Sequence, residues 1–153
     1  MANTYTQLHI QVVFAVKYRA ALIENEWKDR LQQYITAIIQ ANAHKMLQIN
    51  TMPDHLHFFI GLNPDHSISS LVQKVKTQSN LFVNDKKLSE SKFAWQEGYG
   101  AFSYSKSHVD NVISYIQNQE LHHKKKTFLD EYRSMLKAFN IDYDERYIFK
   151  ELV

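Results

Sequence analysis

Apolar and polar positions alternate along residues 7–16, which predicts a strand with one buried face. Residues 24–43 place apolar side chains every three or four positions, which is typical of an amphipathic helix. Residues 45–52 alternate again, and the turn-forming pair Pro53 and Asp54 separates them from an apolar run that ends near Gly61. The pattern therefore predicts a strand, a helix and then a two-stranded hairpin.

The helical period resumes after Ser67, a candidate cap for a helix that runs to about residue 84. Residues 93–105 are rich in aromatic side chains and contain two glycines, which predicts a loop or bulged strand ending at residues 101–104. Ser107 and Asp110 form a candidate capping pair for another helix, and residues 127–139 predict a last one. This order indicates an α+β fold, with a ferredoxin-like or RRM-like antiparallel sheet, helices packed on it and two C-terminal helices.

Length and composition fit one globular domain spanning residues 1–153. The absence of cysteine excludes disulfides, thiolate metal sites and a cysteine nucleophile, and it fits a reducing cytosol. Residues 1–11 lack a signal-peptide pattern, and no apolar run approaches the roughly 20 residues of a membrane span. We therefore expect a cytoplasmic protein with no membrane partner.

The distribution of charge says more about partners than the net charge of +2. Residues 122–126 read His-His-Lys-Lys-Lys, a compact basic block. Basic and aromatic side chains follow the first strand, and two lysines flank the apolar stripe of the helix that begins after Ser67. Each set is either a solvated surface or a DNA contact, with phosphates on the cations and a base stacked on the tyrosine. The DNA-binding candidates are Lys17, Tyr18, Arg19, Lys74 and Lys76.

Two histidines follow the predicted hairpin turn. Because side chains alternate along a strand, His55 and His57 share one face, while Leu56 between them points to the other. Two imidazoles placed in this way can converge on one cation, although strand histidines can also be ordinary hydrogen-bonded polar groups. A metal site would need a third ligand and a reacting group from elsewhere in the chain.

The helix predicted after Ser107 offers both. Tyr115 and Gln119 are four positions apart and are therefore neighbours on one helix surface. Taken separately, each is adequately explained as amphipathic or solvated surface. Together with His55 and His57 they make a site of two imidazoles and one amide oxygen with a phenol beside it.

These motifs resemble those of the single-tyrosine HUH transposases of bacterial insertion sequences, a TnpA-like group related to the REP-associated tyrosine transposases. The family's His-hydrophobic-His motif matches residues 55–57, and its Tyr-x-x-x-Gln motif matches residues 115–119. Residues 95–103 and 119–125 also resemble the family, so the likeness runs nearly end to end.

The resemblance implies a metal-dependent endonuclease and strand transferase that acts on single-stranded DNA hairpins at element ends. Tyr115 would be the nucleophile and would form a 5′-phosphotyrosine. A divalent cation, Mg²⁺ or Mn²⁺, would bind His55, His57 and Gln119 and polarise the scissile phosphate. The resemblance also implies a homodimer in which the tyrosine helix of one chain faces the histidine pair of the other.

Other classes fit fewer of these residues. Histidine-triad hydrolases need a further histidine where this chain has Phe59, and zinc hydrolases with paired histidines usually occupy larger barrels. A non-catalytic ferredoxin-like module that binds single-stranded nucleic acid would need neither the histidine pair nor Gln119. A domesticated relative of the transposase and a purely structural domain are the remaining alternatives.

Overall fold

Four antiparallel strands form the sheet at the centre of the computed structural model, which describes residues 3–153. Residues 1 and 2 lie outside the described residues. They are the first residues of the predicted domain 1–153 and of the stretch 1–11 that lacks a signal-peptide pattern. The spatial order is β2-β3-β1-β4, with β1 at His9–Ala15, β2 at Lys45–Met52, β3 at His55–Gly61 and β4 at Gly100–Tyr104. Strands β2 and β3 form the predicted hairpin, so the expected antiparallel sheet is confirmed.

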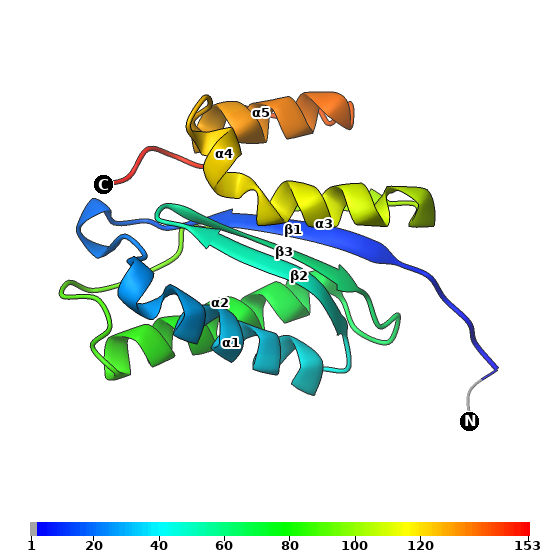
Figure 1. Ribbon diagram of the computed structural model, residues 1–153, viewed down its shortest axis with the longest axis horizontal. Coiled ribbons are helices and arrows are strands. Elements are labelled where there is room, and N and C mark those ends of the chain that lie inside the picture. The colour runs from blue at the N-terminus through cyan, green and yellow to red at the C-terminus, as the bar shows by residue number, and fades with distance from the viewer. Residues whose placement is uncertain (1–2) are drawn as a thin grey trace.

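Helices cover both faces of this sheet (Figure 1). One face carries α1 (Asn25–Ala41) and α2 (Ile68–Asp85). The other carries α3 (Val109–Gln117), α4 (Gln119–His123) and α5 (Phe128–Ala138). The side chains of β3 divide between the two layers. Leu56, Phe58 and Ile60 belong to the main core, whereas Phe59 packs in a separate cluster with residues of α3. The face that carries His55 and His57 is therefore the face under α3, α4 and α5.

Two of the helix starts agree with the sequence prediction. The Ser67 hydroxyl caps α2 by accepting a hydrogen bond from the Ser70 amide at 3.1 Å. The Thr127 hydroxyl caps α5 in the same way, accepting from the Asp130 amide at 3.2 Å.

The predicted capping pair of Ser107 and Asp110 is wrong. Ser107 lies in a 3₁₀ turn at residues 106–108, its hydroxyl contacts the Ser105 hydroxyl at 2.9 Å, and α3 begins only at Val109. The hydroxyl is used inside the turn, so it does not cap the helix. The helical stretch also breaks at Asn118, which separates α3 from α4.

The connector before β4 is fixed at several points. Trp95 pairs with Val16 through an isolated bridge, and its indole donates to the Ser79 hydroxyl at 2.9 Å. At Gly100 a side chain would collide with the Tyr132 ring, because a Cβ atom there would lie 2.7 Å from it. Glycine thus lets α5 pack closely on the start of β4, which sets the position of α5 over the sheet. Within residues 3–153 no helix has the length and apolar character needed to cross a bilayer.

Candidate active site

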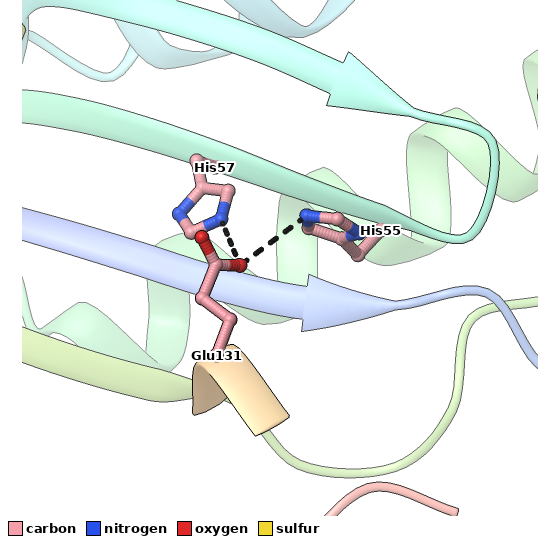
Figure 2. Close-up of side chains that lie close together, drawn as sticks. All are labelled: His55, His57 and Glu131. Carbon is pink, nitrogen blue, oxygen red and sulfur yellow. Dashed lines mark hydrogen bonds and ion pairs between the residues drawn. The ribbon is translucent and has the colours of Figure 1, made fainter. Parts of the chain in front are cut away.

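The centre of the site is a buried carboxylate between two buried imidazoles. His55 and His57 extend from β3, fully buried, with ring centroids 5.1 Å apart. Figure 2 shows Glu131 reaching from α5 toward both rings. Its Oε1 atom lies 3.2 Å from His57 Nε2 and 3.6 Å from His55 Nε2. The three side chains bring one possible ligand atom each to within 4.8 Å of one another.

The remaining predicted site residues meet this cluster. Gln119, the first residue of α4, is fully buried and places its Oε1 atom 3.1 Å from His55 Nε2. Its amide nitrogen donates to Glu131 Oε2 at 3.1 Å. The Tyr115 hydroxyl, from α3, donates to the same Glu131 oxygen. The structure thus brings His55, His57, Tyr115 and Gln119 of one chain together, with Glu131 joining them.

Glu131 was not predicted as a site residue, although the sequence holds a signal for it. Glu131 lies in the apolar stripe of the last predicted helix, three positions after Phe128 and four before Met135. An acidic residue at a core position needs partners, and here they are the histidines. His123, from the basic block, was likewise not predicted as a site residue. Its Nε2 atom lies 3.1 Å from Glu131 Oε1 and 3.1 Å from Gln119 Oε1.

These contacts set the charges of the cluster. Burial raises the pKa of the Glu131 carboxyl, but hydrogen bonds with His123 and His57 outweigh burial and hold that pKa well below its usual range. Burial lowers the pKa of His57 despite its hydrogen bond with Glu131, so that ring is neutral near pH 7. Burial also opposes charge on His123, but the hydrogen bond and charge of Glu131 raise its pKa. The cluster therefore holds an anionic Glu131 and a neutral His57.

Tyr115 is protonated in this arrangement. Burial raises the pKa of its hydroxyl, and the charge of Glu131 together with their hydrogen bond raises it further. The phenol is consequently held in place by the carboxylate rather than ionised by it. A positive charge added beside Glu131 would oppose this effect and favour the phenolate.

A second set of side chains orients the two imidazoles. Asp54 Oδ1 accepts from His55 Nδ1 at 2.7 Å, which turns the Nε2 atom of that ring toward Glu131 and Gln119. Gln11 Nε2 lies 3.0 Å from His57 Nδ1, and Gln11 Oε1 accepts from the Tyr104 hydroxyl at 2.9 Å. Because the Gln11 amide nitrogen donates to His57 Nδ1, the neutral His57 ring carries its proton on Nε2 and donates it to Glu131 Oε1.

The donor set fits a divalent cation. Ligands at about 2.1 Å in an octahedral shell lie roughly 3 Å apart, and the contacts of 3.1 Å from His55 to Gln119 and 3.2 Å from His57 to Glu131 match this spacing. A neutral imidazole, an amide oxygen and one carboxylate are ligand types that Mg²⁺ and Mn²⁺ accept. The carboxylate supplies the negative charge that the predicted set of two histidines and a glutamine lacked.

The DNA-binding candidates lie outside this cluster. Lys17, Tyr18 and Arg19 follow β1, with the Lys17 ammonium 5.4 Å from the centre of the Tyr18 ring. Lys74 donates to Asn42 Oδ1 at 2.9 Å. Lys76 donates to the carbonyl of Gln96 at 2.8 Å, and burial lowers its pKa to about 8. The role of these residues in DNA binding stays a prediction.

Comparison with known sequences identifies relatives along most of the chain. The family described as "Transposase IS200 like" matches residues 4–119, which include both motifs. The ISDra2 transposase TnpA of Deinococcus radiodurans is 26% identical over 118 residues, covering 74% of this chain and 84% of the relative. The transposase of insertion sequence element IS200 from Salmonella typhimurium is 23% identical over 125 residues, covering 78% of this chain and 81% of the relative.

Solved structures share the fold. A putative transposase from Deinococcus radiodurans R1 matches with a TM-score of 0.60 and 22% identity, covering 78% of this chain and 95% of that protein. A REP-associated tyrosine transposase bound to a REP hairpin matches with a TM-score of 0.61 and 14% identity, covering 100% of this chain and 98% of that protein. Because the family match spans more than half of the sequence and contains the residues of the buried cluster on β3, the chain belongs to the IS200-like transposase family.

Proposed function

We propose that this transposase cuts and rejoins single-stranded DNA at hairpin-bearing element ends through a 5′-phosphotyrosine on Tyr115. The observation that carries the proposal is the contact of the Tyr115 hydroxyl with Glu131, whose other oxygen contacts the buried His57. Family membership implies DNA cleavage and strand transfer, and a solved relative is bound to a hairpin. The residues that would hold a divalent cation are His55, His57 and Gln119, joined by Glu131.

The chemistry follows from these groups. The Tyr115 oxygen attacks the scissile phosphorus and the phenol gives up its proton. The bond to the 3′-oxygen breaks, and the leaving strand takes up a proton as a free 3′-hydroxyl. Glu131 holds the phenol by its hydroxyl and so fixes the direction of attack. The cation would polarise the phosphate and offset the charge of Glu131. A second 3′-hydroxyl can then attack the phosphotyrosine and reverse the step without an external energy source.

The test uses labelled single-stranded DNA carrying an end of the element, with Mn²⁺ or Mg²⁺. The proposal predicts a protein–DNA adduct that survives SDS. The alternative of a non-catalytic single-strand binding module predicts retention of the DNA under native conditions and no adduct. If DNA substrates that contain the hairpin and its flanking sequence all bind and none forms an adduct, that alternative is favoured.

Glu131→Gln tests whether the carboxylate belongs to the metal site. Glutamine keeps the volume and one acceptor oxygen but removes the charge, so we expect Mn²⁺ affinity measured by calorimetry to fall at least about tenfold. Glu120→Gln is the matched control, because Glu120 lies exposed on α4 and should leave the affinity unchanged. Equal Mn²⁺ affinity in the Glu131 variant, with an unchanged melting temperature, would remove Glu131 from the metal site.

Salt dependence tests the basic candidates. Each lost phosphate contact lowers the slope of log affinity against log salt by about 0.7 to 0.9, so replacing Lys17, Arg19, Lys74 and Lys76 by alanine should flatten it. Lys76 also holds the Gln96 carbonyl, so a melting curve must accompany this variant. An unchanged slope would assign all four residues to the solvated surface.

The homodimer with shared sites also stays a prediction. It requires α3 to leave its own sheet, where Val109, Val112 and Ile116 pack on Phe59, and to occupy the same place on a partner chain. Mixed dimers of His57→Ala and Tyr115→Phe chains test the exchange. A shared site predicts that co-expressed mixed dimers regain one complete site and form the adduct. A site built within each chain predicts that the mixture stays as inactive as either parent.

A further inference from the structure

A hollow of about 380 Å³ lies beside the candidate nucleophile, lined by residues of α3 and α5 and by Tyr104 of β4. The Tyr115 and Glu131 side chains form part of its wall, so the hollow is continuous with the candidate active site. The proposed metal site and the tyrosine motif leave most of its other residues unexplained, among them Tyr104, Asn111, Met135 and Phe139. A space of this kind next to a reacting group must be filled by substrate or by water.

The wall of the hollow suits a flat aromatic ligand. Tyr104 and Phe139 line it, with their rings edge to face and 5.4 Å between centroids. Phe139 is 36% exposed, which is unusual for a phenylalanine that packs against other aromatic rings. Met135 and Val112 complete an apolar wall from the two helices. Such a surface can stack on a nucleobase without regard to its identity.

The rim of the hollow suits a nucleotide rather than an apolar molecule. Lys126, the last residue of the basic block, lies at the rim and donates to the Ser134 hydroxyl at 2.8 Å. Asn111 is exposed on the α3 side and offers an amide that can donate and accept hydrogen bonds. A cation suits a phosphate, and an amide suits the polar edge of a base.

We propose that this hollow receives the base of a nucleotide adjacent to the scissile phosphate. The inference rests on the proposed function, because it takes Tyr115 as the attacking group. A base held between α3 and α5 would fix the neighbouring phosphate opposite the Tyr115 hydroxyl. Any preference for the base at this position would come from the Asn111 amide at the rim, because the aromatic wall stacks on every base alike.

Ala138→Trp tests the proposal by filling the hollow. Ala138 is the exposed last residue of α5 and lines the hollow, so a larger side chain there removes no internal contact. Lys137→Trp is the matched control, since Lys137 is exposed on the same helix and does not line this hollow. Asn111→Trp fills the hollow from α3 and serves if the first variant melts at a lower temperature.

The probe is single-stranded DNA that contains the mapped cleavage site. It is used intact and as two further substrates, one with a single abasic nucleotide just before the cut and one with a single abasic nucleotide just after it. For the wild type and Lys137→Trp, one abasic position should slow SDS-resistant adduct formation about tenfold, as loss of one base stack does. The filled variants should be about tenfold slower on intact DNA and insensitive to that abasic position. The proposal is overturned if both filled variants form the adduct at the wild-type rate. It is also overturned if the filled variants are slow but are slowed further by the abasic position, or if neither abasic position slows the wild type. No adduct with any wild-type sample would instead overturn the proposed function.

Discussion

Tyr115→Phe is expected to abolish the covalent adduct while the protein keeps its fold and its affinity for hairpin DNA. The ring stays in place beside His57, with 6.1 Å between their centroids, and only the hydroxyl that contacts Glu131 is lost. Losing the nucleophile of a covalent mechanism costs on the order of 10⁶-fold in rate, which would take adduct formation below detection. SDS gels of labelled single-stranded DNA measure the adduct, and native gels measure binding.

Tyr147→Phe is the matched control for this variant. Tyr147 is 80% exposed near the C-terminus and far from the cluster in sequence, so its loss of a hydroxyl should change neither adduct nor binding. Tyr104→Phe is the stricter comparison, because Tyr104 also lies near the site and contacts Gln11. Adduct formation by Tyr115→Phe at the wild-type rate would remove Tyr115 from the mechanism.

Cleavage is expected to require a divalent cation and both histidines, while hairpin binding persists without them. Binding rests on phosphate charge and base stacking, neither of which needs the cation. Excess EDTA should therefore stop adduct formation and leave the native-gel shift in place. His55→Ala and His57→Ala should have the same effect, although His57→Ala also removes one hydrogen-bond partner from Glu131 and one from Gln11.

The EDTA experiment has the advantage that the chain is unchanged, so a lost fold cannot explain the result. Restoring Mn²⁺ should restore the adduct in the wild type but not in the histidine variants. Melting curves must accompany both variants, since each residue is fully buried. Full cleavage in excess EDTA would mean that the histidines orient Glu131 and Tyr115 and hold no metal.

The strand and helix patterns predicted the elements, but the prediction of one buried face for the first strand is wrong: β1 is buried on both faces because helices cover both sides of the sheet. Alternation along β3 placed His55 and His57 opposite Leu56, and the structure has them on the α3 side as a buried pair. Their spacing of four residues also predicted that Tyr115 and Gln119 are neighbours, although the helix breaks at Asn118 between them. The two residues still converge, because Glu131 contacts both side chains.

Glu131 could not be placed from local pattern alone. Its partners lie on β3, α3 and α4, and nothing in the spacing of the last helix says over which strand that helix packs. The close packing of α5 at Gly100 sets that position, and it depends on the whole fold. Lys76 is a similar case, since only the folded connector brings the Gln96 carbonyl to its ammonium.

The most direct measurement is to identify the residue that carries the DNA. Adducts formed by the wild type with single-stranded DNA and Mn²⁺ would be digested with nuclease and protease, and the peptides analysed by mass spectrometry. The proposed mechanism predicts a nucleotide joined through its 5′-phosphate to Tyr115, within the α3 segment 109–117. A nucleotide on another residue, or one joined through a 3′-phosphate, would contradict this mechanism.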